Sequence, residues 1–165
     1  MNAMTAANMS PAEMLFRLAA LNADYAAAID DDRLEEWPAF FLDDCLYKIT
    51  SADNLRDGNE AGIVYADSRA MLADRVLALR RANIYERQTY RHIVGTPRLL
   101  VPEAADIVAE TPFLVVRTMR DGRMDLFVAG RYRDRLRDEA GTLRLRERIV
   151  ICDSSHFDTL VAIPL

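Results

Sequence analysis

FLVVRTMR-DG-RMDLFVAGRYRDRL, residues 113–136, is the stretch that decides the fold. Two runs rich in β-branched and aromatic residues flank Asp121-Gly122. Asp-Gly in this position is a strong hairpin signal, because a type I′ turn needs positive φ at both of its central residues. A two-residue loop then sets the register of the strands, with Val115 facing Val128. The sequence therefore predicts a long antiparallel hairpin that turns at Asp121-Gly122.

The same register predicts which side chains share a face of the hairpin. It has Met119 face Met124 and Arg117 face Leu126. Because side chains alternate between the faces of a strand, one apolar face is expected, consisting of Val115, Met119, Met124, Leu126, Val128 and Tyr132. The opposite face has an apolar end, Leu114, Val116 and Phe127, and then an arginine row, Arg131, Arg133 and Arg135, with Arg137 just beyond.

A third strand is expected after residues 138–142. It repeats the arrangement, with Arg144, Arg146 and Arg148 on one face and Leu143, Leu145, Ile149 and Ile151 on the other. Arginine rows on neighbouring strands place like charges side by side, which costs energy unless carboxylates intervene. One interpretation is a solvated face with interleaved acids such as Asp134 and Glu147. The other is a subunit interface where a partner's acids meet the guanidinium forks, with the candidate residues Arg131, Arg133, Arg135, Arg144, Arg146 and Arg148.

The composition indicates an ordinary globular protein of 165 residues, 51% hydrophobic and 28% charged, with a net charge of −5. That acidic balance argues against a nucleic-acid partner. No apolar run approaches the ~20 residues that span a bilayer, and no signal peptide opens the chain, so we expect a cytoplasmic location without membrane contact. Cys45 and Cys152 are expected to be buried thiols rather than a disulfide. We expect residues 1–9 to form a flexible tail and residues 10–165 a single domain.

Helix and strand signals also precede the hairpin. Ser10, Pro11 and Glu13 supply the N-cap, first residue and capping box of a helix that ends at the acids of residues 30–32. The further expected elements are a short helix at 33–41 interrupted by Pro38, a strand at 45–50, an exposed loop at 51–63, a helix from 67 or 68 to about 81 with Leu72, Val76, Leu79 and Met71 buried, strands at 86–94, 99–101 and from 105, and an apolar strand at 159–165.

Helices early and strands late predict an α+β layer fold. The helices would cover one face of a strongly curved, mostly antiparallel sheet. Such a layer makes a cone whose mouth lies between the first helix and the sheet. No repeat or linker interrupts the pattern.

Metal chemistry has little support in the sequence. His92 and His156 are the only histidines in the chain. A site of both histidines with Asp44 or Asp67 is arithmetically possible, but nothing in their spacing favours it. A histidine-ligated iron–sulfur centre needs two Cys and two His in close pairs, and no such pairs occur. We therefore expect no metal and no cofactor in this chain.

Acid–base chemistry is the alternative that the residues leave open. A cone lined by Tyr25, Tyr47, Tyr90 and His92, with Asp44 at its rim, would hold a small aromatic or cyclic substrate. His92 would act as general base, oriented by a carboxylate, while a tyrosine polarises a carbonyl or hydroxyl group. The competing interpretation has the tyrosine hydroxyls satisfied within a packed interior and His92 as a hydrogen-bonded core side chain.

Several segments together resemble the β (small) subunits of aromatic-ring-hydroxylating dioxygenases. The segments occur in the family's order over about residues 12–165. They are LEEW at 34–37, FLDDCLY at 41–47, DSR at 67–69, ML at 71–72, DRV at 74–76, RQTYRHIV at 87–94 and DTLVAIPL at 158–165. The chain is most similar to the small subunits for aromatic acids, such as those of salicylate 5-hydroxylase, terephthalate dioxygenase and anthranilate dioxygenase.

The resemblance implies a cone-shaped fold like that of nuclear transport factor 2 (NTF2-like), which agrees with the predicted order of elements. It also implies a hexamer of three α and three β subunits, in which the α subunit holds the Rieske [2Fe-2S] cluster and the mononuclear iron. The β subunit of that family is mostly structural. No catalytic residue is carried over, because the matching segments are not catalytic motifs.

The expected function is therefore that of a non-catalytic small subunit that scaffolds a catalytic α subunit and contacts sister β subunits during the oxidation of an aromatic acid. One rival is a stand-alone dehydratase or isomerase that uses His92 with Tyr25, Tyr47 or Tyr90. Another is a binding protein for an aromatic ligand.

Overall fold

The computed structural model describes residues 9–59, 62–81, 88–157 and 161–165. Most of the predicted flexible tail, residues 1–8, lies outside this range. The elements, in order, are α1 (Pro11–Asp30), the 3-10 helix η2 (Trp37–Phe40), β1 (Phe41–Ser51), α2 (Ala52–Arg56), β2 (Val64–Ala66), α3 (Arg69–Arg81), β3 (Gln88–Val94), β4 (Arg98–Leu99), β5 (Ile107–Met119), β6 (Met124–Glu139) and β7 (Thr142–Cys152). Helices gather early and strands late, so the α+β prediction is confirmed.

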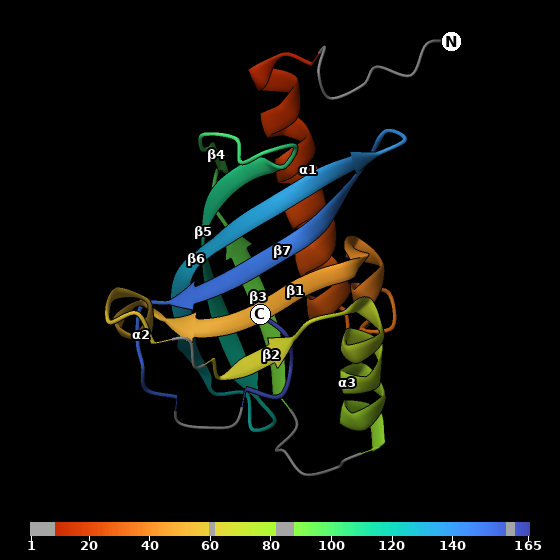
Figure 1. The fold of residues 1–165 in the computed structure, drawn as a ribbon. Helices are drawn as coiled ribbons and strands as arrows, with labels where there is room; N and C mark the ends of the chain where they lie inside the picture. The colour runs from red at the N-terminus through yellow and green to blue at the C-terminus, as the bar shows by residue number, and fades with distance from the viewer. Residues whose placement is uncertain (1–8, 60–61, 82–87, 158–160) are drawn as a thin grey trace.

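The described strands form one seven-stranded sheet in the order β2-β1-β7-β6-β5-β3, with β4 paired to β5. Its pairings are antiparallel except between β1 and β7. The sheet is strongly curved, and β3 passes behind β1 and β7 in the view of Figure 1. Helix α1 also lies behind these strands and contacts β3, so it covers the inner face of the sheet.

Helix α1 begins where the sequence predicts. The Ser10 hydroxyl accepts a hydrogen bond from the Glu13 amide (3.2 Å), and the Glu13 carboxylate accepts one from the Ser10 amide (2.8 Å). This capping box satisfies amide groups that the first turn leaves without helical partners. Met9 precedes the box and packs against the core.

The β5–β6 hairpin forms as predicted, but its turn is of another type. Gly122 has a φ of +87°, while Asp121 is not among the residues with positive φ. The Met119 amide donates to the Arg123 carbonyl (2.8 Å) and the Gly122 amide to the Met119 carbonyl (2.9 Å). These bonds describe a three-residue loop with glycine in the left-handed region, the next commonest hairpin class after the two-residue turn.

The longer loop changes the register near the turn. Thr118 pairs with Met124, and Arg117 pairs with Asp125 rather than Leu126. A β-bulge then restores the predicted pair of Val115 with Val128. Because a bulge adds one residue to one strand, the side chains on the turn side of it change faces. The expectation that Met124 and Leu126 share the buried face is therefore wrong: they are 66% and 64% exposed.

A second bulge, between Arg135 and Leu136 of β6, changes the faces of β7. Leu145 pairs with Leu136 and Glu147 with Arg135, which leaves Arg146 as the extra residue. Arg148 consequently points into the core and is fully buried. The prediction that Arg148 shares a face with Arg144 and Arg146 is wrong for this reason.

Smaller differences follow from local chemistry. The predicted helix at 33–41 is reduced to the four residues of η2, with Pro38 at its start. The predicted loop at 51–63 contains the short helix α2, whose N-cap is Ser51. Met71 is 43% exposed rather than buried. Residues 161–165 form no strand, yet all of them are buried.

Candidate functional site

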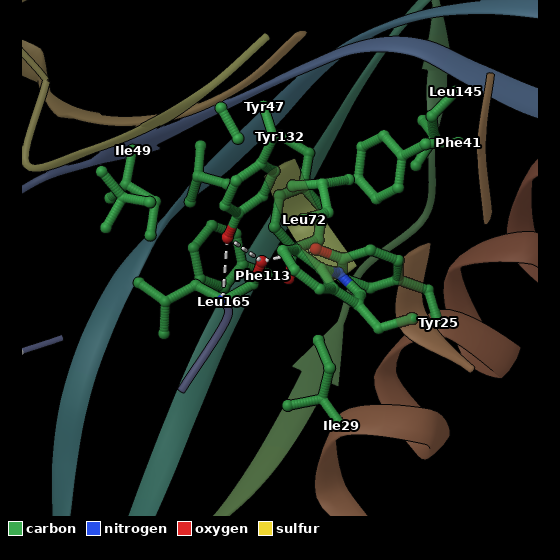
Figure 2. Packing of buried hydrophobic residues seen from close by; sticks show 14 of the residues in the cluster. Tyr25, Ile29, Phe41, Tyr47, Ile49, Leu72, Phe113, Tyr132, Leu145 and Leu165 are labelled. Carbon is green, nitrogen blue, oxygen red and sulfur yellow. Dashed lines mark hydrogen bonds between the residues drawn. The ribbon is translucent and has the colours of Figure 1, made fainter. Parts of the chain in front are cut away.

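The polar groups of the cone interior bind the end of the described chain. Tyr25 on α1 donates its hydroxyl to the Leu165 carbonyl oxygen (2.9 Å), and Tyr47 on β1 donates to the same oxygen (3.2 Å). The Leu165 amide donates to the Tyr47 hydroxyl (3.1 Å). Figure 2 shows both hydroxyls converging on Leu165 among the aromatic side chains of the core. All three residues are fully buried.

Burial also decides the protonation state of these tyrosines. Burial raises the pKa of Tyr25, although the nearby Arg148 guanidinium opposes the shift. Burial likewise raises the pKa of Tyr47 and Tyr132 well above the ordinary value. Both hydroxyls of Tyr25 and Tyr47 therefore remain neutral donors at neutral pH. They do not line an open mouth, because main-chain atoms of Leu165 occupy the space in front of them.

His92 is held by a carboxylate that the sequence analysis did not name. The Asp30 carboxylate lies 2.6 Å from the His92 Nδ1 atom and accepts a hydrogen bond from the His92 amide (2.8 Å). Asp30 is the last residue of α1 and the first of three consecutive acids. No pattern in the sequence indicates that Asp30, unlike its two neighbours, points into the protein. The His92 side chain is fully buried, and its Nε2 atom has no partner in the described part of the chain. A substrate in solution does not reach this nitrogen in the observed conformation.

Tyr90 and Asp44, the other two candidate residues of the acid–base site, lie apart from each other. Tyr90 is buried near His92, with ring centroids 6.3 Å apart, and stacks on Phe127. Asp44 is exposed and lines a surface groove of about 290 Å³ together with Cys45, Arg135 and Arg146. The structure thus brings Tyr90 and His92 together. The Asp44 side chain lies on the outside of the sheet, whereas Cys45 and Tyr47 point inward.

Arg148 forms an ion pair in the centre of the cone. Its Nε and Nη2 atoms each lie 2.8 Å from a carboxylate oxygen of Asp134, and Nη2 also donates to the Asn22 side chain (2.6 Å). The guanidinium carbon lies 4.2 Å from the ring centroid of Tyr25 and 4.1 Å from that of Tyr132. The signal in the sequence was Asp134, a charged residue that alternates with Tyr132 and Leu136 on the apolar face.

The remaining arginines of the predicted rows lie on the outer face among carboxylates. Asp106, whose side chain is fully buried, accepts from Arg135 (3.2 Å), Arg137 (2.7 Å) and Arg146 (2.8 Å). Glu110 lies 3.2 Å from Arg131, Glu103 lies 3.7 Å from Arg133, and Arg144 donates to the Ala39 carbonyl. The acids that pair with these arginines, Glu103, Asp106 and Glu110, come from the segment before β5 and from β5 itself, whereas Asp134 binds Arg148 in the interior.

An apolar strip on the same outer face is not covered by any of the residues that the structure describes. Ile93, Met124 and Leu126 are each more than half exposed. Ile93 pairs with Leu114 and Leu126 with Val116, so the strip crosses β3, β5 and β6 without a gap. Large apolar side chains gathered in this way are typical of a surface that contacts another protein.

The thiols are unsuited to nucleophilic chemistry. Cys45 and Cys152 are free and buried, as predicted. Burial raises the pKa of Cys45 to about 11 and that of Cys152 to about 12. Neither thiol ionises near neutral pH, and the thiolate is the reactive form.

The described residues offer neither a candidate metal cluster nor a candidate membrane-spanning helix. Among the residues that the structure describes, no three His, Cys, Asp or Glu side chains gather in a way that could hold a metal ion. None of the described helices combines the length and apolarity that crossing a bilayer requires.

The chain is similar to known proteins along most of its length. A family model described as "Ring hydroxylating beta subunit" matches residues 25–159. The chain is 50% identical over 149 residues to subunit beta 1 of the terminal oxygenase component of terephthalate 1,2-dioxygenase from Comamonas sp, which covers 90% of this chain and 97% of that one. It is 37% identical over 150 residues to the anthranilate 1,2-dioxygenase small subunit of Burkholderia cepacia, with 91% and 93% covered.

A solved structure agrees with these matches. The beta subunit of a proposed aromatic-ring-hydroxylating dioxygenase from Novosphingobium aromaticivorans superimposes with a TM-score of 0.84 at 39% identity. The match covers 92% of this chain and 97% of that chain. The cone-shaped fold that the resemblance implied is thereby confirmed.

Proposed function

The chain belongs to the family of ring hydroxylating beta subunits, and on that premise we propose that it supports, and does not itself perform, the oxidation of an aromatic acid. One observation supports the proposal above all others. The chain is 50% identical, over 90% of its length, to a beta subunit of terephthalate 1,2-dioxygenase. The geometry supports it. The hydroxyls of Tyr25 and Tyr47 are already hydrogen-bonded to main-chain atoms of Leu165, so they are not available to bind a substrate.

Beta subunits of terminal oxygenases have α subunits as partners. For this chain we propose an assembly of three α and three β subunits in the cytoplasm. The Rieske cluster and the mononuclear iron would both be held by the α subunit, and this chain would hold no metal or cofactor. The absence of close Cys and His pairs in its sequence supports that division.

The outer face of the sheet is the surface that we propose for subunit contact. It combines the apolar strip around Leu126 with the outer arginines, Arg131, Arg133, Arg135, Arg144 and Arg146. Aromatic, apolar and arginine side chains are typical of interface cores, and arginine binds carboxylates through two parallel hydrogen bonds. Arg148 does not belong to this surface because it is buried within its own chain.

Co-expression with the α subunit from the same operon tests the proposal. We expect the two chains to co-purify as a brown complex that oxidises an aromatic acid when a reductase supplies electrons. The chain expressed alone should be colourless, free of tightly bound iron by elemental analysis, and inactive. The mass of the complex by light scattering gives its stoichiometry.

Two results would contradict the proposal. One is tightly bound iron in the isolated chain. The other is turnover of a cyclic substrate by the isolated chain that is lost on His92→Ala substitution, because the pair of His92 and Asp30 is what an acid–base enzyme would use.

A further inference from the structure

We propose that the start of α1 is a self-association surface, where two copies of this chain pair across a two-fold axis and each inserts Phe16 into an apolar groove of the other. The surface lies on the helix, apart from the outer face of the sheet that we propose for subunit contact. The inference concerns copies of this chain alone and does not rest on assembly with an α subunit.

The groove follows the first turns of α1. Met9, Ala12, Glu13, Phe16 and Arg17 line it, and its volume is about 450 Å³. Ala12 is the smallest of these side chains and lies one helical turn before Phe16, so a gap adjoins a large ring on one face of the helix. In Figure 1 the first turns of α1 project past the strands at the top of the view. This end of the helix is therefore accessible to another molecule.

Phe16 is the side chain that fits such a groove. It is 77% exposed, more than any other aromatic side chain among the described residues. Met14 and Leu18, which point from α1 into the core, are buried. Phe16 thus contributes little to the packing of its own chain, and its ring would gain from burial against another apolar surface.

The ring and the groove adjoin on one helix, and this favours a two-fold pair. A two-fold interface brings the same patch of both copies together, so a ring and a gap side by side complete each other twice. With the two α1 helices antiparallel, Phe16 of each copy lies over Ala12 of the other. A parallel pair would instead place Phe16 on Phe16.

The charges beside the groove agree with the antiparallel arrangement. Glu13 and Arg17 lie one turn apart and have opposite signs, so the antiparallel pair brings Glu13 of each copy towards Arg17 of the other. Hydrogen bonds from Ser10 hold the pKa of Glu13 below its ordinary value, so this exposed carboxylate is ionised at neutral pH. Arg17 is held in place by the Asp138 carboxylate (2.6 Å) and the Gly141 carbonyl (2.9 Å).

The size of the contact predicts a weak dimer. A phenylalanine buries about 150–250 Å², so two rings contribute about 300–500 Å². Stable interfaces bury about 1,200–2,000 Å² in total. We therefore expect a dissociation constant on the order of 0.1 mM.

Sedimentation velocity of the full chain, at concentrations up to about 1 mM, tests the proposal. Leu126→Glu is present throughout, so that the apolar strip on the outer face does not contribute to association. We expect a shift from monomer to dimer as the concentration rises. Phe16→Ser should weaken this dimer at least about tenfold without lowering the melting temperature, because Phe16 is exposed in the single chain. A chain that stays monomeric throughout would overturn the proposal.

Ala12→Leu separates a specific fit from general hydrophobic association. The substitution adds apolar surface but fills the groove, so we expect it to weaken the dimer at least about fivefold. Ala23→Leu is the matched control, because Ala23 is exposed on the same helix outside the groove, and it should leave the dimer unchanged. A dimer that Ala12→Leu strengthens would overturn the insertion of Phe16.

Two further measurements exclude other occupants of the groove. A chain without residues 1–8 should dimerise like the full chain, and a dimer that forms only after this deletion would overturn the proposal by assigning the groove to those residues. Phe16→Ser should co-purify with the α subunit as well as the natural chain does. Loss of that co-purification would assign Phe16 to the α subunit and overturn the self-association, while the proposed function would stand.

Discussion

At the scale of single residues, the buried ion pair of Arg148 with Asp134 is central to the interior of this protein. Arg148 lies between the rings of Tyr25 and Tyr132 and binds both carboxylate oxygens of Asp134. A buried pair contributes modestly when complete, but loss of one partner leaves a charge without compensation. Arg148 also contacts Asn22, so it links α1 to two strands of the sheet.

Replacing Arg148 should therefore be severe. Arg148→Met keeps most of the side-chain volume but leaves Asp134 buried and unpaired, and we expect the free energy of unfolding to fall by about 3–5 kcal/mol. Urea denaturation followed by circular dichroism measures this loss. Arg133→Met on the outer face is the matched control and should change stability by less than about 0.5 kcal/mol. Similar losses for the two variants would contradict the assigned role.

Asp106 provides a pH-dependent contribution on the outer face. Burial raises the pKa of Asp106, but hydrogen bonds from Arg137 and Arg146 outweigh it, and the pKa lies below the ordinary value. A carboxyl with a lowered pKa in the folded state adds stability above its unfolded pKa of about 3.9, and this contribution is lost as the pH falls through the folded value.

Asp106→Asn tests that contribution. The substitution removes the charge that three arginines share, and we expect the free energy of unfolding to fall by about 1–2 kcal/mol at pH 7. The difference between the variant and the natural chain should stay constant down to about pH 5 and narrow below about pH 4. Urea denaturation across this pH series measures it. A difference that widens in acid would contradict the assigned pKa direction.

At the scale of elements, two bulges decide which side chains of the long strands face inward. The bulge near Val115 exposes Leu126, and the bulge at Arg146 brings Arg148 into the core. Strand alternation alone placed both residues on the wrong face, because one extra residue inverts a pattern of period two.

Gly130 in β6 shows how closely β6 and β7 approach. A Cβ atom at Gly130 would lie 2.2 Å from the carbonyl oxygen of Ile151, a main-chain atom that moves only with its strand. We expect Gly130→Ala to lower the free energy of unfolding by about 2–3 kcal/mol, at the upper end of overpacking costs. Gly122→Ala is the comparison, because its cost of about 1 kcal/mol arises from positive φ alone, with open space around the residue. Thermal denaturation should rank the two variants in this order.

At the scale of the whole molecule, the two faces of the sheet differ in what covers them. The inner face is covered by α1 and filled by aromatic side chains and by segment 161–165 (Figures 1 and 2). The outer face carries the apolar strip and the paired arginines, and no part of the described chain covers the strip. The exposed strip is the surface that we propose for contact with other subunits.

A charge placed in the strip should separate the subunits without unfolding the chain. Leu126→Glu introduces a carboxylate at a position 64% exposed in the single chain. We expect the variant to keep its melting temperature and to lose most of its co-purification with the α subunit or with sister β subunits. Leu77→Glu on α3, 46% exposed, is the control and should co-purify normally. The opposite pattern would place the interface on α3 instead of the sheet.

The sequence by itself determined the order of the longer elements but not α2, β2 or the lack of a strand at 161–165; it also determined the capped start of α1, the hairpin at Asp121-Gly122 and the buried thiols. Each depends on local chemistry: caps, turns and side-chain period act within a few residues. Its resemblance to ring-hydroxylating β subunits also identified the family.

Only the tertiary structure decided which polar residues lie inside. The pair of His92 with Asp30 joins residues 62 positions apart, and Leu165 meets Tyr25 across 140 positions. Arg148 and Asp134 are register partners on the adjacent strands β6 and β7, and a bulge turns Arg148 to the inner face. A bulge changes no local propensity yet moves every following side chain to the other face. The contents of the cone were therefore set by the closing of the sheet around α1, which no local pattern encodes.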